Sequence, residues 1–106
     1  MHGADGVNYL DRLATLIHDE VPAASLPQED TRVLFRMYAI LLLALGEAVT
    51  TEDVHNAWVA WMSGRDPYHS SLVPYKELTS DVASEDGPYV EAIRRLARRS
   101  GPDAAV

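Results

Sequence analysis

Side chains able to recognise a ligand gather in one stretch of this sequence, residues 50–78. The five that predict a binding site are Trp58, Trp61, Arg65, His69 and Tyr75. Indole and phenol rings stack on planar groups, and imidazole and guanidinium groups donate hydrogen bonds to an anionic or carbonyl group. Apolar walls around such groups exclude water. The stretch therefore predicts either a site for a small, nucleotide-like ligand or a docking surface for another protein.

The same residues also fit a structural role. Val54, Trp58 and Trp61 recur at helical spacing, so both indoles can pack into a core instead of forming a stacking platform. Burying one indole removes on the order of 150–250 Å² of surface from water. A small domain can hardly leave two indoles exposed. The apolar segment 72–78 can likewise plug one end of a helical core. Both alternatives are open from the sequence.

Residues that could support catalysis are not arranged in a recognisable pattern. Asp53 with His55, or Asp66 with His69, can be drawn as acid–base pairs, but neither pair has a nucleophile or an oxyanion site at a known spacing. The histidines do not form an H-x-x-x-H or H-E-x-x-H metal motif. The chain has no cysteine, which excludes thiolate chemistry and cysteine-based zinc sites. We expect a non-catalytic protein without a cofactor or metal.

Composition and charge indicate one globular domain. The 106 residues are 47% hydrophobic and 24% charged, which is typical of a folded chain and not of a disordered one. The net charge of −7 argues against nucleic-acid binding, which needs a basic face. The longest apolar run, residues 37–45, is about half of the ~20 residues that span a membrane, and the N-terminus lacks a secretion signal. We expect a cytoplasmic protein that binds neither nucleic acid nor membranes.

Helix start and stop signals are strong at several positions. Asn8 followed by Asp11, and Thr50 followed by Asp53, are N-cap patterns that satisfy free backbone N–H groups. Gly46 provides a left-handed helix stop. Together with the apolar periodicity, these signals predict helices over residues 8–20, 29–45, 51–62 and 88–99, the last one stopped by Gly101-Pro102.

The predicted architecture is a compact, all-α, four-helix array. Helix 29–45 is apolar on nearly every side, so we expect it at the centre of the fold and covered all round. The helices form a single domain, residues 8–100, between a flexible leader (1–7) and a flexible tail (101–106). The last helix carries four arginines, which predict either a solvated helix face or a patch that binds an anion or a partner. These are Arg94, Arg95, Arg98 and Arg99.

A long connection, residues 64–87, links the third and fourth predicted helices. Long loops in small domains usually bind something or contain short elements of their own. The apolar residues Leu72, Val73, Tyr75 and Leu78 predict that the connection is ordered and rests on the core. We expect one or two short helical turns within it.

The residues around this connection resemble the ryanodine-receptor-type repeat, the RYR domain. That family has a helix with His and Trp, then an insert, then a His-Pro-x-Leu-Val-Pro-Tyr-x-Glu-Leu segment and another helix. The resemblance covers residues 51–97 and rests on His55, Trp58, His69, Leu72, Val73, Pro74, Tyr75, Glu77 and Leu78. Ser70 stands where the family has proline, and residues 60–68 replace the family's insert.

The resemblance implies a binding or sensing module, with nucleotide-like ligands and partner domains as the implied targets. The whole chain also resembles small helical proteins of actinobacteria and their phages. The alternative to a ligand-binding module is an interaction protein, either a homodimer or an accessory protein that docks on a host factor, because the apolar helix 33–45 can use a partner surface to complete its coverage.

Overall fold

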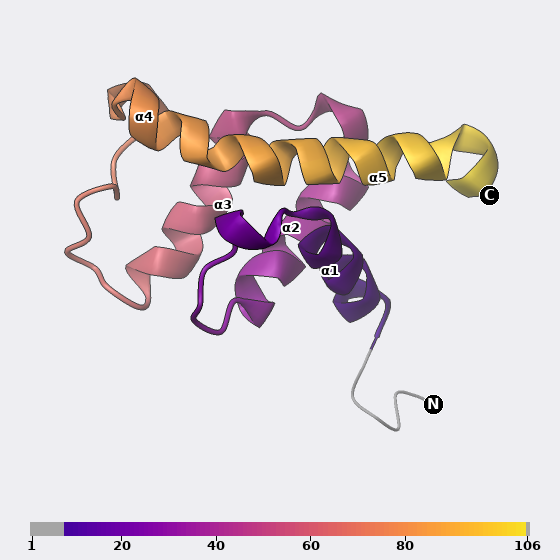
Figure 1. Ribbon diagram of the computed structural model, residues 1–106, viewed down its shortest axis with the longest axis horizontal. Helices are drawn as coiled ribbons and strands as arrows, with labels where there is room; N and C mark the ends of the chain where they lie inside the picture. The colour runs from indigo at the N-terminus through magenta and orange to yellow at the C-terminus, as the bar shows by residue number, and fades with distance from the viewer. Residues whose placement is uncertain (1–7, 106) are drawn as a thin grey trace.

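The computed structural model describes the backbone of residues 8–105 and the side chains of residues 8–99. Four long helices form the domain: α1 (Tyr9–Glu20), α2 (Arg32–Leu45), α3 (Thr51–Ser63) and α5 (Gly87–Ala105). α5 crosses over α1, α2 and α3 and contacts all three (Figure 1). No strand occurs in residues 8–105, so the predicted all-α, four-helix array is confirmed. The predicted leader, residues 1–7, lies outside the described residues.

The two predicted capping boxes are present at the starts of α1 and α3. The side chain of Asn8 accepts a hydrogen bond from the Asp11 N–H (3.1 Å), and the Asp11 carboxylate accepts one from the Asn8 N–H (3.2 Å). Thr50 and Asp53 form the same reciprocal pair at 3.1 and 2.9 Å. Each pair satisfies two N–H groups that the helix leaves free. Both helices therefore begin within one residue of the predicted positions.

The ends of α2 differ in how well the sequence predicts them. The helix begins at Arg32 and not at residue 29, because the Asp30 carboxylate accepts hydrogen bonds from the Arg32 N–H (3.1 Å) and guanidinium (2.7 Å). Asp30 therefore supplies its charge from just outside the helix. At the other end, Gly46 has a φ of +55°, which only glycine adopts readily, and the helix stops there as predicted.

The helix α5 is longer than predicted. It passes through Gly101 and Pro102 and reaches Ala105 (Figure 1). A proline disfavours helical backbone in the residue before it partly through a clash with that residue's Cβ. Gly101 has no Cβ, so this restraint is weak here, and the predicted stop at Gly101-Pro102 is wrong.

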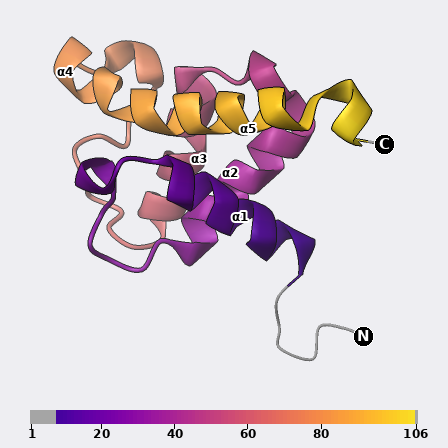
Figure 2. The ribbon, with the colours of Figure 1, turned by 45° about the vertical axis from the view of Figure 1, so that its right-hand side comes forward.

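The core lies between α2 and the three helices around it. Its largest fully buried side chains include Tyr38, Leu34, Ile17 and Ile93, one or more from each of α2, α1 and α5. Figure 2 shows α1 lying against α2, with α5 passing above both. Helices that share one core bury one stripe each and leave the opposite side to water.

The prediction that the second helix is covered all round is wrong. Val33, Ile40 and Leu43 on α2 are 56%, 53% and 57% exposed. Only one side of α2 is buried, because α1, α3 and α5 gather around the side that carries Phe35, Tyr38 and Ala39. An apolar face is therefore left open on the outer side of α2.

All four arginines of α5 pair with groups on other segments, and two of them bind backbone carbonyls. The Arg95 guanidinium donates to the Glu20 carboxylate (3.1 Å) and to the Glu20 backbone carbonyl (3.0 Å) at the C-terminal end of α1. The Arg94 guanidinium donates twice to the carbonyl of Val49, at 3.1 and 2.7 Å. These arginines satisfy carbonyl groups that helix and loop ends leave unpaired. They hold α5 in place instead of forming a simple solvated face.

The connection between α3 and α5 is ordered and contains three short helical elements. These are η3 (Tyr75–Glu77), α4 (Ser80–Ala83) and η4 (Ser84–Asp86). The buried His55 of α3 donates from Nε2 to the Val73 carbonyl (2.7 Å), and Thr51 donates to the Tyr75 hydroxyl (2.9 Å). The segment therefore folds back onto α3, as predicted. Within the described residues, no helix is long and apolar enough to cross a bilayer.

Candidate functional site

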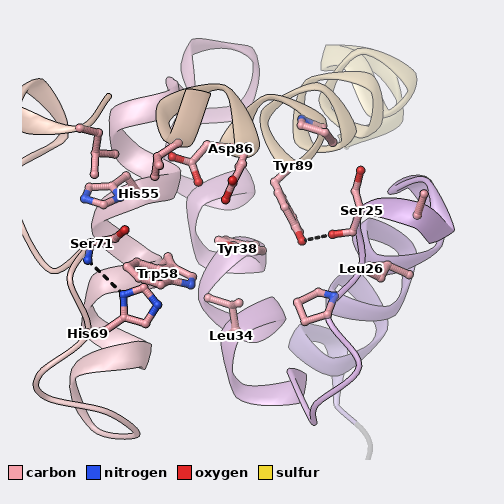
Figure 3. A pocket seen from close by; sticks show the side chains of 16 residues that line it. Ser25, Leu26, Leu34, Tyr38, His55, Trp58, His69, Ser71, Asp86 and Tyr89 are labelled. Atoms are coloured by element: carbon pink, nitrogen blue, oxygen red, sulfur yellow. Dashed lines mark hydrogen bonds between the residues drawn. The ribbon is translucent and has the colours of Figure 1, made fainter. Parts of the chain in front are cut away.

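A pocket with a volume of about 480 Å³ opens between the α3 side of the molecule and the start of α5. Its lining residues come from five parts of the chain: the η1 region (η1 is Ala23–Ser25), α2, α3, the connection, and the η4 to α5 junction. Figure 3 shows Trp58 and His69 on one side, Tyr89 and Ser25 on the other, and Tyr38 between them. The pocket is therefore assembled by the tertiary fold and by no single motif.

Aromatic rings form much of the pocket wall. Trp58 meets the His69 ring edge to face, with centroids 5.0 Å apart and planes at 82°. Tyr38, between the two sides, lies with its ring centroid 5.5 Å from that of Tyr89 and 5.2 Å from that of Phe35. Rings in contact at these distances hold one another in place. The wall is thus a rigid aromatic surface facing a space the size of a small ligand.

Hydrogen bonds fix the proton positions of the two histidines that line the pocket. The Ser71 N–H donates to Nδ1 of His69 (3.0 Å), so neutral His69 carries its proton on Nε2. His55 donates from Nε2 to the Val73 carbonyl, so neutral His55 has its lone pair on Nδ1. Each ring therefore has a defined tautomer. The remaining ring nitrogen of His69 is therefore a donor, Nε2–H. The remaining ring nitrogen of His55 is an acceptor, Nδ1.

The two tyrosines stay neutral at any ordinary pH. Burial raises the pKa of Tyr38 well above its usual value, and burial together with the nearby Asp86 raises the pKa of Tyr89. The Tyr89 hydroxyl donates to the Ser25 backbone carbonyl at 2.6 Å, which ties the start of α5 to the loop after α1 (Figure 3). The Tyr89 oxygen keeps a lone pair as an acceptor.

Two carboxylates, Glu85 and Asp86, also line the pocket. Asp86 lies between His55 and Tyr89 in Figure 3 and is only partly exposed. Among the described residues, none donates a hydrogen bond to its carboxylate or forms an ion pair with it. Burial raises the pKa of Asp86 to about 6, although the nearby His55 lowers it and Glu85 raises it further. A carboxyl group with a perturbed pKa in a cleft is a candidate for a functional role.

The structure brings two of the five predicted site residues to this pocket. Trp58 and His69 line it, whereas Trp61, Arg65 and Tyr75 do not. Trp61 is 8% exposed and packs in the core, because it lies one turn further along α3, with the Arg65 guanidinium 4.7 Å above its ring. Tyr75 packs on His55 and is bonded to Thr51 outside the pocket. A ligand role for any of the five stays a prediction.

Sequence reasoning did not identify most of the pocket's polar and aromatic lining. Tyr38, Tyr89 and Asp86 come from helices or helix ends whose patterns predict only core packing or a helix start. The sequence held one signal for Asp86 as a pocket residue. Asp86 directly precedes the Gly87-Pro88 helix start, where a carboxylate lies at the edge of the domain's core. Within the described residues, no cluster of three or more His, Asp or Glu side chains is placed to hold a metal ion.

Fold and pocket together define a small all-α domain with an aromatic-walled pocket between its helices. The chain belongs to a family of domains of unknown function (DUF7701), whose model matches residues 8–98. The matched range contains all the residues that line the pocket. No curated protein and no solved structure matches the chain.

Proposed function

We propose that this protein is a non-catalytic, cytoplasmic binding module whose pocket takes a small planar molecule. The observation that carries the proposal is the pocket of about 480 Å³ walled by Trp58, Tyr38 and Tyr89. Ligand sites in proteins usually have volumes of roughly 300–1,000 Å³, with apolar and aromatic walls and a few polar groups. The two histidines and the Tyr89 hydroxyl supply such polar groups here.

A heterocyclic ring, such as the base of a nucleotide-like ligand, suits this pocket. Its plane can lie against Trp58 while His69 donates from Nε2 and His55 accepts at Nδ1. Phosphate groups suit it less, because no Lys or Arg is among the described residues that line the pocket. The resemblance to the RYR repeat, which stays a prediction, supports the same type of role. The ring and not the phosphate is therefore the part of the ligand we place inside.

A pair of single-tryptophan variants tests this proposal. Trp61→Phe leaves Trp58, on the pocket wall, as the only tryptophan, and Trp58→Phe leaves only the core residue Trp61. We expect planar heterocycles to change the fluorescence of the Trp61→Phe variant in a saturable way and to leave the Trp58→Phe variant unchanged. A screen of neutral, cationic and anionic heterocycles in which the Trp58 signal never saturates would contradict the proposal.

Protein interaction is a second candidate, favoured by the exposed apolar face of α2. Val33 and Ile40 lie two turns apart on the side of α2 away from the core, and Leu43 continues this face. Burying each such side chain in an interface contributes roughly 1.5–3 kcal/mol. We propose a second copy of this chain as the partner, because a homodimer would cover the same face on both subunits.

Molar mass in solution tests the homodimer. We expect light scattering to show a dimer at high protein concentration and Ile40→Lys to convert it to a monomer. Tyr68→Lys is the matched control, since Tyr68 is 93% exposed and lies outside this face. A wild-type protein that stays strictly monomeric at every concentration would exclude this candidate.

A further inference from the structure

The charge distribution inside the pocket is one-sided. Glu85 and Asp86 both come from η4 and line the pocket, while none of the described lining residues is Lys or Arg. Asp86 has no hydrogen-bond donor or cationic partner among the described residues, although its side chain is only partly exposed to water. A carboxylate in that position gains free energy from any cation that enters beside it.

The walls around this carboxylate also favour positive charge. The faces of tyrosine and tryptophan rings carry negative electrostatic potential, and they attract ammonium and guanidinium-like groups within about 6 Å. Tyr38, Tyr89 and Trp58 supply three such rings from three helices. Aromatic walls with a carboxylate at one end are the combination that binds organic cations. The same combination opposes an anionic ligand.

We propose that the pocket selects a planar organic cation, an amidinium or aromatic ammonium group, which pairs with Asp86 while its ring lies against Trp58. This inference rests on the proposed ligand-binding function and adds the charge of the ligand to it. An amidinium group has the geometry to donate two parallel hydrogen bonds to one carboxylate. Glu85, next to Asp86, adds negative potential at the rim without a need for direct contact.

Asp86 gives binding its pH dependence, and several titratable groups face it. They are Glu85 beside it, His55 from α3, Tyr38 from α2 and Tyr89 at the start of α5, with His69 across the pocket. The tyrosines stay neutral, whereas Asp86 loses its proton as the pH rises and makes the pocket more negative. Cation affinity is therefore expected to increase as the pH rises from about 5 to about 7.5, through the range in which Asp86 ionises.

Three isosteric probes separate charge from shape: benzamidinium (cationic), benzamide (neutral) and benzoate (anionic). Binding is measured by the fluorescence of Trp58 in the Trp61→Phe protein. We expect benzamidinium to bind at least about tenfold more tightly than benzamide, a ratio that corresponds to one good charged contact, and benzoate to bind most weakly. Asp86→Asn is expected to remove this preference. Asp81→Asn, on the exposed surface of α4, is the control and is expected to keep it.

The outcomes distinguish this inference from the function it rests on. If benzamide or benzoate binds as tightly as benzamidinium, or if Asp86→Asn keeps the preference, the pocket binds ligands but not by selecting a cation, and the inference is wrong. If none of the three probes and no heterocycle of the wider screen binds, the ligand-binding function and this inference are both wrong. Circular dichroism of each variant confirms that its helices are intact.

Discussion

Asp86 is the residue at which the structure makes its clearest thermodynamic prediction. Burial raises its pKa from 3.8 to about 6, so the folded state holds the proton more tightly than the unfolded chain does. This contribution to stability is fully present below the unfolded pKa and is lost as the pH rises through about 6. We expect Asp86→Asn to be more stable than wild type by about 2 kcal/mol near pH 8, less than the full shift implies because the site is partly solvated.

The same variant is expected to match wild type near pH 3, because Asp86 is then mostly protonated in both the folded and the unfolded state. Urea denaturation at the two pH values measures the difference, with Asp81→Asn as the exposed control. An Asp86→Asn protein that is no more stable than wild type at the higher pH would show that the carboxylate is well solvated, contrary to its partial burial in the structure.

His55 is the second residue with a defined energetic role. His55 is 3% exposed. Its Nε2–H donates the hydrogen bond that the Val73 carbonyl accepts from α3. His55→Phe keeps an aromatic ring but leaves that carbonyl without its donor, so we expect a loss of about 1–3 kcal/mol in the free energy of unfolding. His18→Phe is the control, because His18 is half exposed and also packs on an aromatic ring. Equal stabilities of the two variants would contradict the role of His55 as the anchor of the connection.

At the scale of elements, α5 is held by its arginines as well as by its apolar face. Arg95 donates hydrogen bonds to both the carboxylate and the backbone carbonyl of Glu20. The Arg98 guanidinium lies 3.7 Å from the Glu47 carboxylate, and the Arg98 side chain is half exposed. We expect Arg95→Met to cost about 1 kcal/mol and Arg98→Met less than about 0.5 kcal/mol in chemical denaturation. Equal losses of stability in the two variants would mean that the hydrogen bonds from Arg95 to the end of α1 contribute no more than the exposed ion pair of Arg98.

The helices were predictable because their signals are local. Asn8 with Asp11 and Thr50 with Asp53 are complete capping boxes within four residues, and Gly46 needs only its own φ. The start of α2 was predicted less well, because Asp30 acts from outside the helix. The open face of α2 was not predictable from its apolar sequence, since the number of neighbouring helices that cover a helix is a property of the tertiary fold.

At the scale of the whole molecule, the pocket depends on contacts between distant parts of the chain. Ser25 and Tyr89 are 64 positions apart and are joined by one hydrogen bond, while Trp58 and Tyr38 come from separate helices. Sequence spacing predicted Trp58 and His69 because they belong to the same short stretch. It could not show which face of α2 or α5 meets that stretch, so Tyr38 and Asp86 were missed and Trp61 and Arg65 were included.

Indole N–H resonances provide the most direct measurement of the central claim, because the protein has two tryptophans and only one of them lines the pocket. In a ¹H–¹⁵N titration of the wild-type protein with benzamidinium, we predict a saturable shift of the Trp58 indole and little change at Trp61. Assignment follows from the two Trp→Phe variants. A titration that leaves both indoles unmoved, or that moves Trp61 as much as Trp58, would contradict ligand binding in this pocket.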